Sequence, residues 1–554
     1  MLPIEKGFFV SEKQTLGEFF HNNFPNDEMN IVAGILDDKI CGLQTEVFGN
    51  HVIRPVFLQS EIGQRIYRRS VVFILIIAVH KLFDNAEVVV RFTANKGLYC
   101  DVSLKDGVLS AEHITQIRNE MKKIVSENIP ITKKHLEKDK AIQLFKETKQ
   151  IAKVNLINSL KLDKVSIYYC GKYYDYFYGT MLDNTGRLGK FEIDFEEPGL
   201  LLRTPAGGDE PSAKIKQPKL KYILTESKKW AGILHCGYIS DLNRFIKQNR
   251  ITDIIRVSEA LHEKWISNIA DDIAENIDRA RLIMIAGPSS SGKTSFTQRL
   301  KVQLRVWGLE PVSLSLDDYF LERVKSPKTA DGQYDYEALE ALDLELINDH
   351  LVKLLDGEPI MHPKYDFISG ERELDAVGPV ILPPGQPLLI EGIHGLNEKL
   401  TSAIPRNKKY KIYVSALTQL NIDQHNRIPS TDARMIRRLV RDYQFRGAGG
   451  LKTLKQWPIV RAGEERNIFP FQEDADTVFN SALLYELPVL KKYAVSILKD
   501  IPDDSEYHWI IQNILDKLSF FEAIEDEDEI PHNSILREFI GNSCFFKADG
   551  DLKE

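Results

Sequence analysis

The chain has 554 residues, more than one hydrophobic core can organise, so we expect three or four domains. Hydrophobic residues make up 43% and charged residues 27%, and no apolar stretch approaches the ~20 residues that cross a membrane. The net charge of −8 argues against nucleic acid as the main partner, and five cysteines without C-x-x-C pairs argue against a zinc ribbon.

The N-terminal part predicts small mixed units of helix and strand. Residues 1–60 show a helix at 15–23 and short strands at 31–36 and 40–42. Farther along, apolar spacing predicts helices at 71–82, 111–127 and 140–151 and strands at 87–92, 165–169 and 172–178. Four prolines and three glycines between residues 196 and 219 then predict a linker.

The C-terminal half predicts an α/β fold. Amphipathic helices fill residues 225–280, and beyond them strands alternate with helices. The predicted strands are 282–286, 311–316, 387–391 and 411–415, and the predicted helices are 295–304, 342–355, 432–445 and 481–498. Such alternation builds a parallel sheet with helices on both faces. The chain from residue 501 predicts a helical tail.

Residues 287–294 read G-P-S-S-S-G-K-T and complete the phosphate-loop pattern G-x-x-x-x-G-K-[ST] between a strand and a helix. In this pattern, backbone N–H groups and the helix N-terminus bind the α- and β-phosphates. Lys293 can reach the β- and γ-phosphates, and the Thr294 hydroxyl can ligate Mg²⁺. We therefore expect a nucleoside triphosphate to contact Gly287, Pro288, Ser289, Ser290, Ser291, Gly292, Lys293, Thr294 and Ser295.

Acidic residues follow two of the predicted strands. SLSLDDYF ends one strand with Asp317 and Asp318, and LLIEG ends another with Glu391. At the carboxyl edge of a parallel sheet, such carboxylates point into the ligand crevice. Asp317 is the candidate acceptor of a proton from an attacking hydroxyl, and Glu391 the candidate that orients metal-bound water. No guanine-reading N-K-x-D occurs in the sheet region, which disfavours a GTPase.

The predicted helix at 434–446 carries five arginines in thirteen residues. Four of them share one face, at spacing i, i+3, i+4 and i+7: Arg434, Arg437, Arg438 and Arg441. A stripe of guanidiniums suits a lid that closes over phosphates and excludes water. The alternative is a surface helix that pairs with Asp432 and Asp442.

Six motifs resemble, in order, those of the uridine kinase/phosphoribulokinase family, and most closely those of the uridine–cytidine kinases. They are GPSSSGKTS, SLSLDDYF, GQYDYEALEALD, PKYDFISGER, LLIEGIHG and RMIRRLVRDYQFRG. The resemblance covers about residues 280–500. It implies a P-loop kinase that uses ATP, as Mg·ATP, to phosphorylate the ribose 5′-hydroxyl of a nucleoside.

The resemblance also implies roles residue by residue. Asp317 would be the general base, and Lys293 and Arg441 the other catalytic residues. Thr294 and Glu391 would surround Mg²⁺, and Arg446 would add a contact to ATP. The substrate would be bound by Asp317, Tyr319, Glu337, Tyr365, Phe367, Arg438 and Gln456.

Two positions depart from the family pattern. Gly370 stands where the family has a base-reading histidine, and Ala448 stands where an arginine is expected. Without a polar group that hydrogen-bonds to the edge of the base, the sequence does not determine which base the site prefers. Two alternatives therefore remain: a kinase of another sugar or sugar phosphate, as in phosphoribulokinase, and a nucleotide-switched regulator associated with RNA or the ribosome.

The N-terminal half carries a second resemblance. Residues 1–60 resemble the TGS module, a ubiquitin-like β-grasp domain. Residues 61–222 resemble the second additional domain of threonyl-tRNA synthetases, through RRSVVF at 68–73 and KYYDYFYGTM at 172–181. That domain edits mischarged tRNA with H-x-x-x-H and a later Cys and His. Here these positions hold Arg69, Phe73, Phe177 and Met181, which cannot bind zinc.

Together these features predict five segments: a TGS-like domain at 1–60, an editing-like domain at 61–222, a helical connector at 223–280, a P-loop kinase domain at 281–500 and a helical tail at 501–554. We expect a nucleoside as small-molecule partner, and neither nucleic acid, zinc nor a membrane. The first residues lack the basic and apolar regions of a signal peptide, which predicts a cytoplasmic location. The sequence does not determine whether the chain forms a homo-oligomer.

Overall fold

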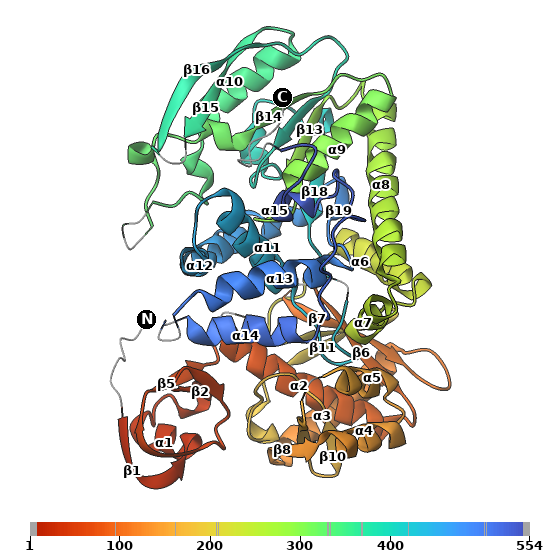
Figure 1. The fold of residues 1–554 in the computed structure, drawn as a ribbon, viewed down its shortest axis with the longest axis vertical. Coiled ribbons are helices and arrows are strands. Elements are labelled where there is room, and N and C mark those ends of the chain that lie inside the picture. The colour runs from red at the N-terminus through yellow and green to blue at the C-terminus, as the bar shows by residue number, and fades with distance from the viewer. Residues whose placement is uncertain are drawn as a thin grey trace.

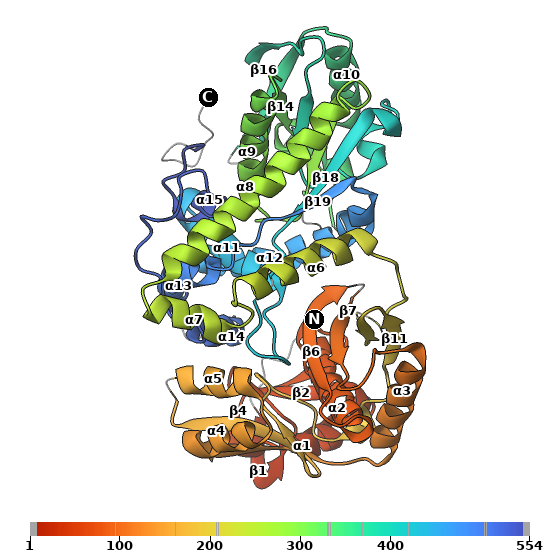
Figure 2. The ribbon, with the colours of Figure 1, turned by 90° about the vertical axis from the view of Figure 1, so that its right-hand side faces the viewer.

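Two lobes are stacked along the long axis of the molecule (Figure 1). The computed structural model describes residues 8–546 apart from residues 95, 161, 207, 209, 330, 331, 333, 367, 368, 419, 503, 504 and 506. The N-terminal half forms one lobe, and the phosphate-loop sheet with its helices forms the other (Figure 2). None of the helices in this described part combines the length and apolarity that a membrane crossing requires.

A small mixed unit opens the chain. Its elements are β1 (Phe8–Thr15), α1 (Leu16–Asn23), β2 (Ile31–Leu36), β3 (Lys39–Cys41), β4 (Glu46–His51) and β5 (Ile53–Phe57). β1 pairs with β4, and β2 lies between β3 and β5, all antiparallel. Thr15 caps α1, because its Oγ1 accepts a hydrogen bond from the Glu18 N–H while the Glu18 carboxylate accepts one from the Thr15 N–H. The helix and both strands predicted here are confirmed.

The second unit surrounds one long buried helix. Its elements are α2 (Glu61–Leu82), β6 (Glu87–Ala94), β7 (Gly97–Ser103), α3 (Ala111–Ser126), β8 (Ile131–Glu137), α4 (Lys138–Glu147), α5 (Ile151–Ser159), β9 (Lys164–Cys170), β10 (Tyr173–Asp175), β11 (Glu192–Glu196) and β12 (Gly199–Arg203). They form antiparallel sheets in the orders β11-β12-β7-β6 and β10-β9-β8. Residues 70–79 of α2 are all buried, as expected of a helix that is apolar on every side.

Two expectations for this unit are wrong. α2 begins at Glu61 rather than at residue 71, because Ser60 Oγ accepts a hydrogen bond from the Gly63 N–H at 3.1 Å and caps a helix whose first turns are polar. The predicted linker contains β12, an inner strand that is buried through Leu202. The apolar run in β12 therefore outweighs the prolines and glycines around it.

Five parallel strands form the sheet of the second lobe, in the order β14-β17-β13-β18-β19, which confirms the α/β class. The elements of this lobe are α6 (Pro218–Ile233), α7 (Ile239–Lys247), α8 (Ile251–Glu275), β13 (Leu282–Ala286), α9 (Lys293–Val306), β14 (Val312–Ser315), α10 (Leu344–Leu355), β15 (Ile360–Asp366), β16 (Glu371–Val380), β17 (Leu388–Glu391), β18 (Lys409–Ser415), α11 (Ser430–Phe445), α12 (Gly450–Asn467), β19 (Thr477–Asn480), α13 (Glu486–Lys499), α14 (His508–Ser519) and α15 (Arg537–Ile540). Sequence patterns missed the β15–β16 hairpin, α12 and β19. The proposed boundary at 222/223 falls inside α6.

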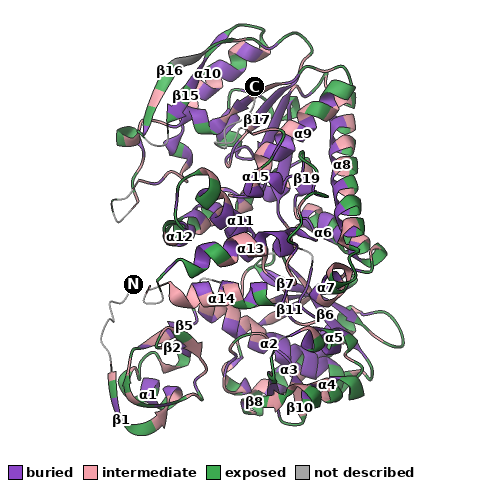
Figure 3. Ribbon diagram, viewed as in Figure 1, coloured by how far each residue is buried: buried purple, intermediate pink, exposed green. Residues whose placement is uncertain are grey.

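One hydrophobic core joins the two lobes and the tail. It contains Phe145 of α4, Phe296 of α9, Leu439 of α11 and Phe539 of α15. Figure 3 shows α11 and α15 as largely buried elements. The segment after residue 501 is therefore an integral part of the second lobe.

The loop before α11, residues 420–429, inserts into the N-terminal lobe. The Val90 N–H donates to the Gln424 carbonyl at 2.8 Å, and Asn421 Nδ2 donates to the Val90 carbonyl at 2.7 Å. The Tyr178 N–H donates to Asn426 Oδ1 at 2.9 Å. The N-terminal lobe thus holds the segment that leads directly into α11.

A buried ion pair adds a second link to α11. Asp432, in its first turn, accepts hydrogen bonds from Arg65 of α2 at 2.8 Å and from Lys517 of α14 at 2.6 Å. Burial alone would raise the pKa of Asp432, but the charges of Arg65 and Lys517 hold it below its usual range. The position of α11 therefore depends on a residue from the other lobe.

Replacing Arg65 with methionine should destabilise the protein by about 1–3 kcal/mol, because buried Asp432 loses one of its two cationic partners. Thermal and urea denaturation measure this change. Arg250→Met removes an exposed pair with Asp253 and is the matched control, with an expected effect below about 0.5 kcal/mol. Equal stability of the two variants would contradict the link.

Candidate active site

Glycines shape the phosphate loop between β13 and α9. Gly292 has φ +81° and precedes the first residue of α9. A Cβ on Gly287 would lie 1.9 Å from the Val414 carbonyl oxygen, so no larger residue fits there. The loop therefore approaches β18 closely and presents its N–H groups at the start of α9.

Lys293 and Thr294 begin α9 and lie beside Glu391 at the end of β17. Lys293 Nζ donates to the carbonyls of Gly287 at 2.9 Å and Pro288 at 3.3 Å. Thr294 Oγ1 donates to Glu391 Oε1 at 3.1 Å. Burial raises the pKa of Glu391 to about 7, against the opposing charge of Lys293.

The Thr294 hydroxyl and the Glu391 carboxylate fit Mg²⁺, which prefers hard oxygen ligands and usually takes only one or two from a protein. The raised pKa of Glu391 fits as well, because a divalent cation would stabilise the buried carboxylate. Within the described residues, no group of three or more His, Cys, Asp or Glu side chains is arranged to hold a metal ion. Any bound Mg²⁺ would therefore complete its coordination with phosphate oxygens and water.

The two aspartates after β14 point in different directions. Asp318 is buried, 3.5 Å from Lys364 Nζ and 3.7 Å from His362 Nε2, and burial raises its pKa. Asp317 is exposed and lies within electrostatic reach of Lys293 and Glu391. Only Asp317 is therefore available to an incoming hydroxyl.

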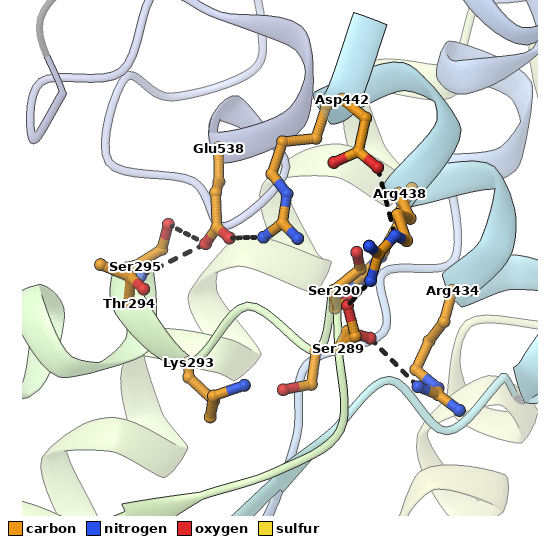
Figure 4. A network of polar contacts seen from close by, with 12 residues as sticks. Ser289, Ser290, Lys293, Thr294, Ser295, Arg434, Arg438, Asp442 and Glu538 are labelled. Atoms are coloured by element: carbon orange, nitrogen blue, oxygen red, sulfur yellow. Dashed lines mark hydrogen bonds and ion pairs between the residues drawn. The ribbon is translucent and has the colours of Figure 1, made fainter. Parts of the chain in front are cut away.

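Arg434 and Arg437 of α11 donate hydrogen bonds to carbonyls of the phosphate loop, and Figure 4 shows the contact between Arg434 and Ser289. Arg434 pairs with Glu464 and donates to the Ser289 carbonyl at 3.0 Å. Arg437 pairs with Glu486 and donates to the loop carbonyl of Ser290 at 3.4 Å and to the neighbouring Ser481 carbonyl at 2.8 Å. Both side chains are buried, and α11 packs in the core, so the structure replaces the expected lid with a fixed support. The alternative of a surface helix is also wrong.

The outer arginines of α11 face the loop or solvent. Arg438 Nη1 donates to Ser289 Oγ at 2.9 Å (Figure 4). Arg441 Nη1 donates to Glu538 Oε1 at 3.1 Å, and exposed Arg446 contacts Asp442 at 3.4 Å. Each of these three arginines is paired in this structure, Arg438 and Arg446 with Asp442 and Arg441 with Glu538.

Glu337 joins this group from the loop before α10. A Cβ on Gly463 of α12 would lie 2.4 Å from the Glu337 Cβ, so this glycine permits the close approach. Burial, and then the charge of Glu464, raise the pKa of Glu337 to about 7, while Arg438 and Lys293 oppose the shift. Glu337 therefore lies within electrostatic reach of Arg438, and the substrate-binding role of the two residues stays a prediction.

The other predicted substrate residues are more scattered. Tyr319 is buried, with its hydroxyl 3.0 Å from His350 Nδ1, so its polar group faces the core. Tyr365 is buried against Phe320, with ring centroids 5.6 Å apart. Gln456 is exposed on α12. Phe367 lies outside the described residues.

The departure at Gly370 has a structural reason. Gly370 has φ +78°, and a Cβ there would lie 2.6 Å from Arg323 Nε. The Arg323 guanidinium, which donates to Tyr336 at 3.1 Å, therefore takes the space that a side chain at 370 would need. With Arg323 in this position, a histidine at residue 370 would not fit.

Sequence patterns missed the tail residues that contact the phosphate loop. Ile535 packs against Gly292, where an added Cβ would lie 2.5 Å from Ile535 Cγ2. Glu538 accepts a hydrogen bond from Ser295 Oγ at 2.8 Å (Figure 4). No local signal in the tail could have indicated these contacts, since they depend on folding over a long sequence separation.

The positions predicted to correspond to the editing motifs form a packed cluster. Arg69 donates to the Thr180 carbonyl, and the rings of Phe73 and Phe177 lie 5.3 Å apart. His425, from the loop before α11, stacks on Phe177 with ring centroids 6.2 Å apart. The second lobe thus covers this centre with its own loop.

Comparison with known proteins matches both halves of the chain. Residues 282–484 match the model of the Phosphoribulokinase / Uridine kinase family, which supports a P-loop kinase in this part of the chain. Among solved structures, a possible uridine kinase from Bacillus stearothermophilus shares 17% identity, with a TM-score of 0.26, over 38% of this chain and 97% of that chain.

The N-terminal region is similar to threonine–tRNA ligases. The ligase of Thermotoga neapolitana is 31% identical over 165 residues, which cover 29% of this chain and 26% of the ligase. The ligase of Aquifex aeolicus is 29% identical over 191 residues, which cover 34% of this chain and 30% of the ligase. The chain therefore spans only about a quarter to a third of the length of these relatives.

The raised pKa of Glu337 predicts how stability changes with pH. The folded protein holds this proton up to about pH 7, whereas the unfolded chain releases it near the ordinary glutamate pKa of 4.5. The free energy of unfolding should therefore fall by at most about 3 kcal/mol as pH rises through this window. Glu337→Gln should flatten that part of the profile, measured by urea denaturation. An unchanged slope would contradict the assignment.

The substitutions at the editing positions predict that the protein binds no zinc and does not deacylate seryl-tRNA, because Arg69, Phe73, Phe177 and Met181 supply no zinc ligand. Elemental analysis of the purified chain and a deacylation assay test this expectation. Stoichiometric zinc or measurable deacylation would overturn it.

Proposed function

We propose that residues 281–500 form a Mg·ATP-dependent kinase that phosphorylates the ribose 5′-hydroxyl of a nucleoside. The observation that carries this proposal is the convergence of Lys293, Glu391 and Asp317 beside the phosphate loop. They follow β13, β17 and β14, whose carboxyl ends meet at one edge of the parallel sheet. This edge is where open α/β sheets bind ligands.

In this proposal, the chain's own residues position the reactants. Lys293 leaves the carbonyls of Gly287 and Pro288 and donates to the β- and γ-phosphates. Thr294 and Glu391 would hold Mg²⁺, which would supply positive charge to the phosphates. Asp317 accepts the proton of the acceptor hydroxyl. The hydroxyl oxygen bonds to the γ-phosphorus, and the bond between the γ-phosphorus and the β-phosphate oxygen of ADP breaks. Arg438 and Arg441 balance the transferring charge.

Several contacts support a nucleoside as the acceptor. Phe320, Tyr336 and Tyr365 form an aromatic cluster beside the Asp317 turn, which suits a planar base. Glu337 lies within electrostatic reach of Arg438 and Lys293, and this carboxylate and guanidinium suit the hydroxyls of a ribose. The family description names uridine kinase, which supports the same choice.

A sugar phosphate is the second candidate acceptor. The Arg323 guanidinium occupies the corner above Gly370, and guanidinium groups favour phosphate. The family description also names phosphoribulokinase. A thermal-shift panel of nucleosides and sugar phosphates, with a nonhydrolysable ATP analogue and Mg²⁺, separates the candidates. Stabilisation by nucleosides supports the proposal, and stabilisation by sugar phosphates alone contradicts it.

Two substitutions should abolish transfer for different reasons. Lys293→Ala removes the cation that reaches the phosphates, so both ATP binding and turnover should weaken. Asp317→Asn keeps the shape but not the proton acceptor, so kcat should fall ~10²–10⁴-fold while ATP binding is largely retained. Steady-state kinetics and calorimetry with ATP measure both effects.

Asp318→Asn is the matched control for the base. Its carboxylate is buried beside His362 and Lys364 and faces away from the site, so kcat should stay within about tenfold of the wild-type value. Near-normal kcat in Asp317→Asn, or a larger loss in Asp318→Asn, would contradict the role of Asp317.

A further inference from the structure

A carboxylate of the chain lies in the phosphate-binding position at the start of α9. Glu538 Oε2 accepts hydrogen bonds from Ser295 Oγ at 2.8 Å and from the Ser295 N–H at 3.4 Å. α9 begins at Lys293, so the Ser295 N–H belongs to the first turn, which lacks intrahelical acceptors. In a phosphate loop such N–H groups bind the nucleotide's α- and β-phosphates.

The same carboxylate also binds one of the arginines next to the loop. Arg441 Nη1 donates to Glu538 Oε1 at 3.1 Å, and both side chains are largely buried. Glu538 therefore neutralises Arg441, which would otherwise be available to a phosphate. The Glu538 carboxylate thus accepts hydrogen bonds both from Ser295 in the first turn of α9 and from the Arg441 guanidinium.

The backbone of this segment is firmly held. Ile535 packs on Gly292, and the Phe539 ring lies 5.1 Å from the Arg437 guanidinium carbon. Ser534 Oγ donates to Glu259 at 2.6 Å. α15 is buried throughout (Figure 3), so the backbone that carries Glu538 is held beside the start of α9.

We propose that Glu538 is a residue of the nucleotide site that competes with the α-phosphate of ATP for Ser295 and Arg441. This inference rests on the proposed function. Two anions cannot share these donors, so ATP binds fully only when Glu538 turns away, and Arg441 then exchanges a carboxylate for a phosphate. Glu538 thereby lowers the affinity for ATP and sets the concentration at which the site fills.

The test compares Glu538→Gln with Glu525→Gln in the full-length chain. Glutamine keeps the size of residue 538 but removes the charge that competes with phosphate. Glu525 is an exposed carboxylate in the same tail and is the matched control. Calorimetric titration with Mg·ATP gives Kd for each protein, and thermal denaturation without nucleotide reports folding.

Glu538→Gln should bind Mg·ATP about tenfold more tightly than the wild type, since hydrogen bonds to a charged group no longer need to be broken. Glu525→Gln should match the wild type within about twofold. Glu538→Asp, which retains the charge on a shorter side chain, should give an intermediate Kd and covers the case in which Glu538→Gln does not fold.

Unchanged or weaker binding by Glu538→Gln, with normal binding by the wild type, would overturn this inference and leave the proposed function intact. A lower melting temperature with unchanged Kd would show that Glu538 only caps α9, which also overturns it. Failure of wild type and variants alike to bind Mg·ATP would instead refute the proposed function.

Discussion

Two buried guanidinium–carboxylate pairs, Arg434 with Glu464 and Arg437 with Glu486, are the constraint on which the site depends. Removing one partner would leave an uncompensated buried charge, which commonly costs about 3–5 kcal/mol. Each arginine also donates to a backbone carbonyl of the phosphate loop, Arg434 to Ser289 at 3.0 Å and Arg437 to Ser290 at 3.4 Å. These carbonyls are thus held on the α11 side, and Glu464 also accepts a hydrogen bond from the Ser289 N–H at 3.1 Å. α11 is a support, and its outer face supplies Arg438 and Arg441.

The N-terminal lobe contributes to this support through packing and charge. The positions that correspond to the editing motifs are filled by Phe73 and Phe177 and covered by His425 of the other lobe. The same loop continues into α11, whose first turn is fixed by Arg65. A domain similar to a tRNA-editing module therefore contacts the helix that carries the phosphate-loop arginines, and the two halves share one core.

Elements with strong local signals could be predicted from the sequence. The strand–loop–helix at the phosphate loop and the strand ends at Asp317 and Glu391 have such signals, since apolar runs and glycine spacing are local properties. β12 and the start of α2 were missed because tertiary pairing and a serine cap outweigh composition. The contacts of Glu538 and Arg65 join residues far apart in the chain, so no pattern in one sequence could reveal them.

The most direct test of the account is to follow Mg·ATP and a mixture of uridine, cytidine, adenosine and guanosine with the purified protein by ³¹P NMR. The account predicts a new phosphomonoester signal that couples to the ribose 5′ protons and grows in step with ADP. Formation of ADP and inorganic phosphate without any nucleoside phosphomonoester would contradict it.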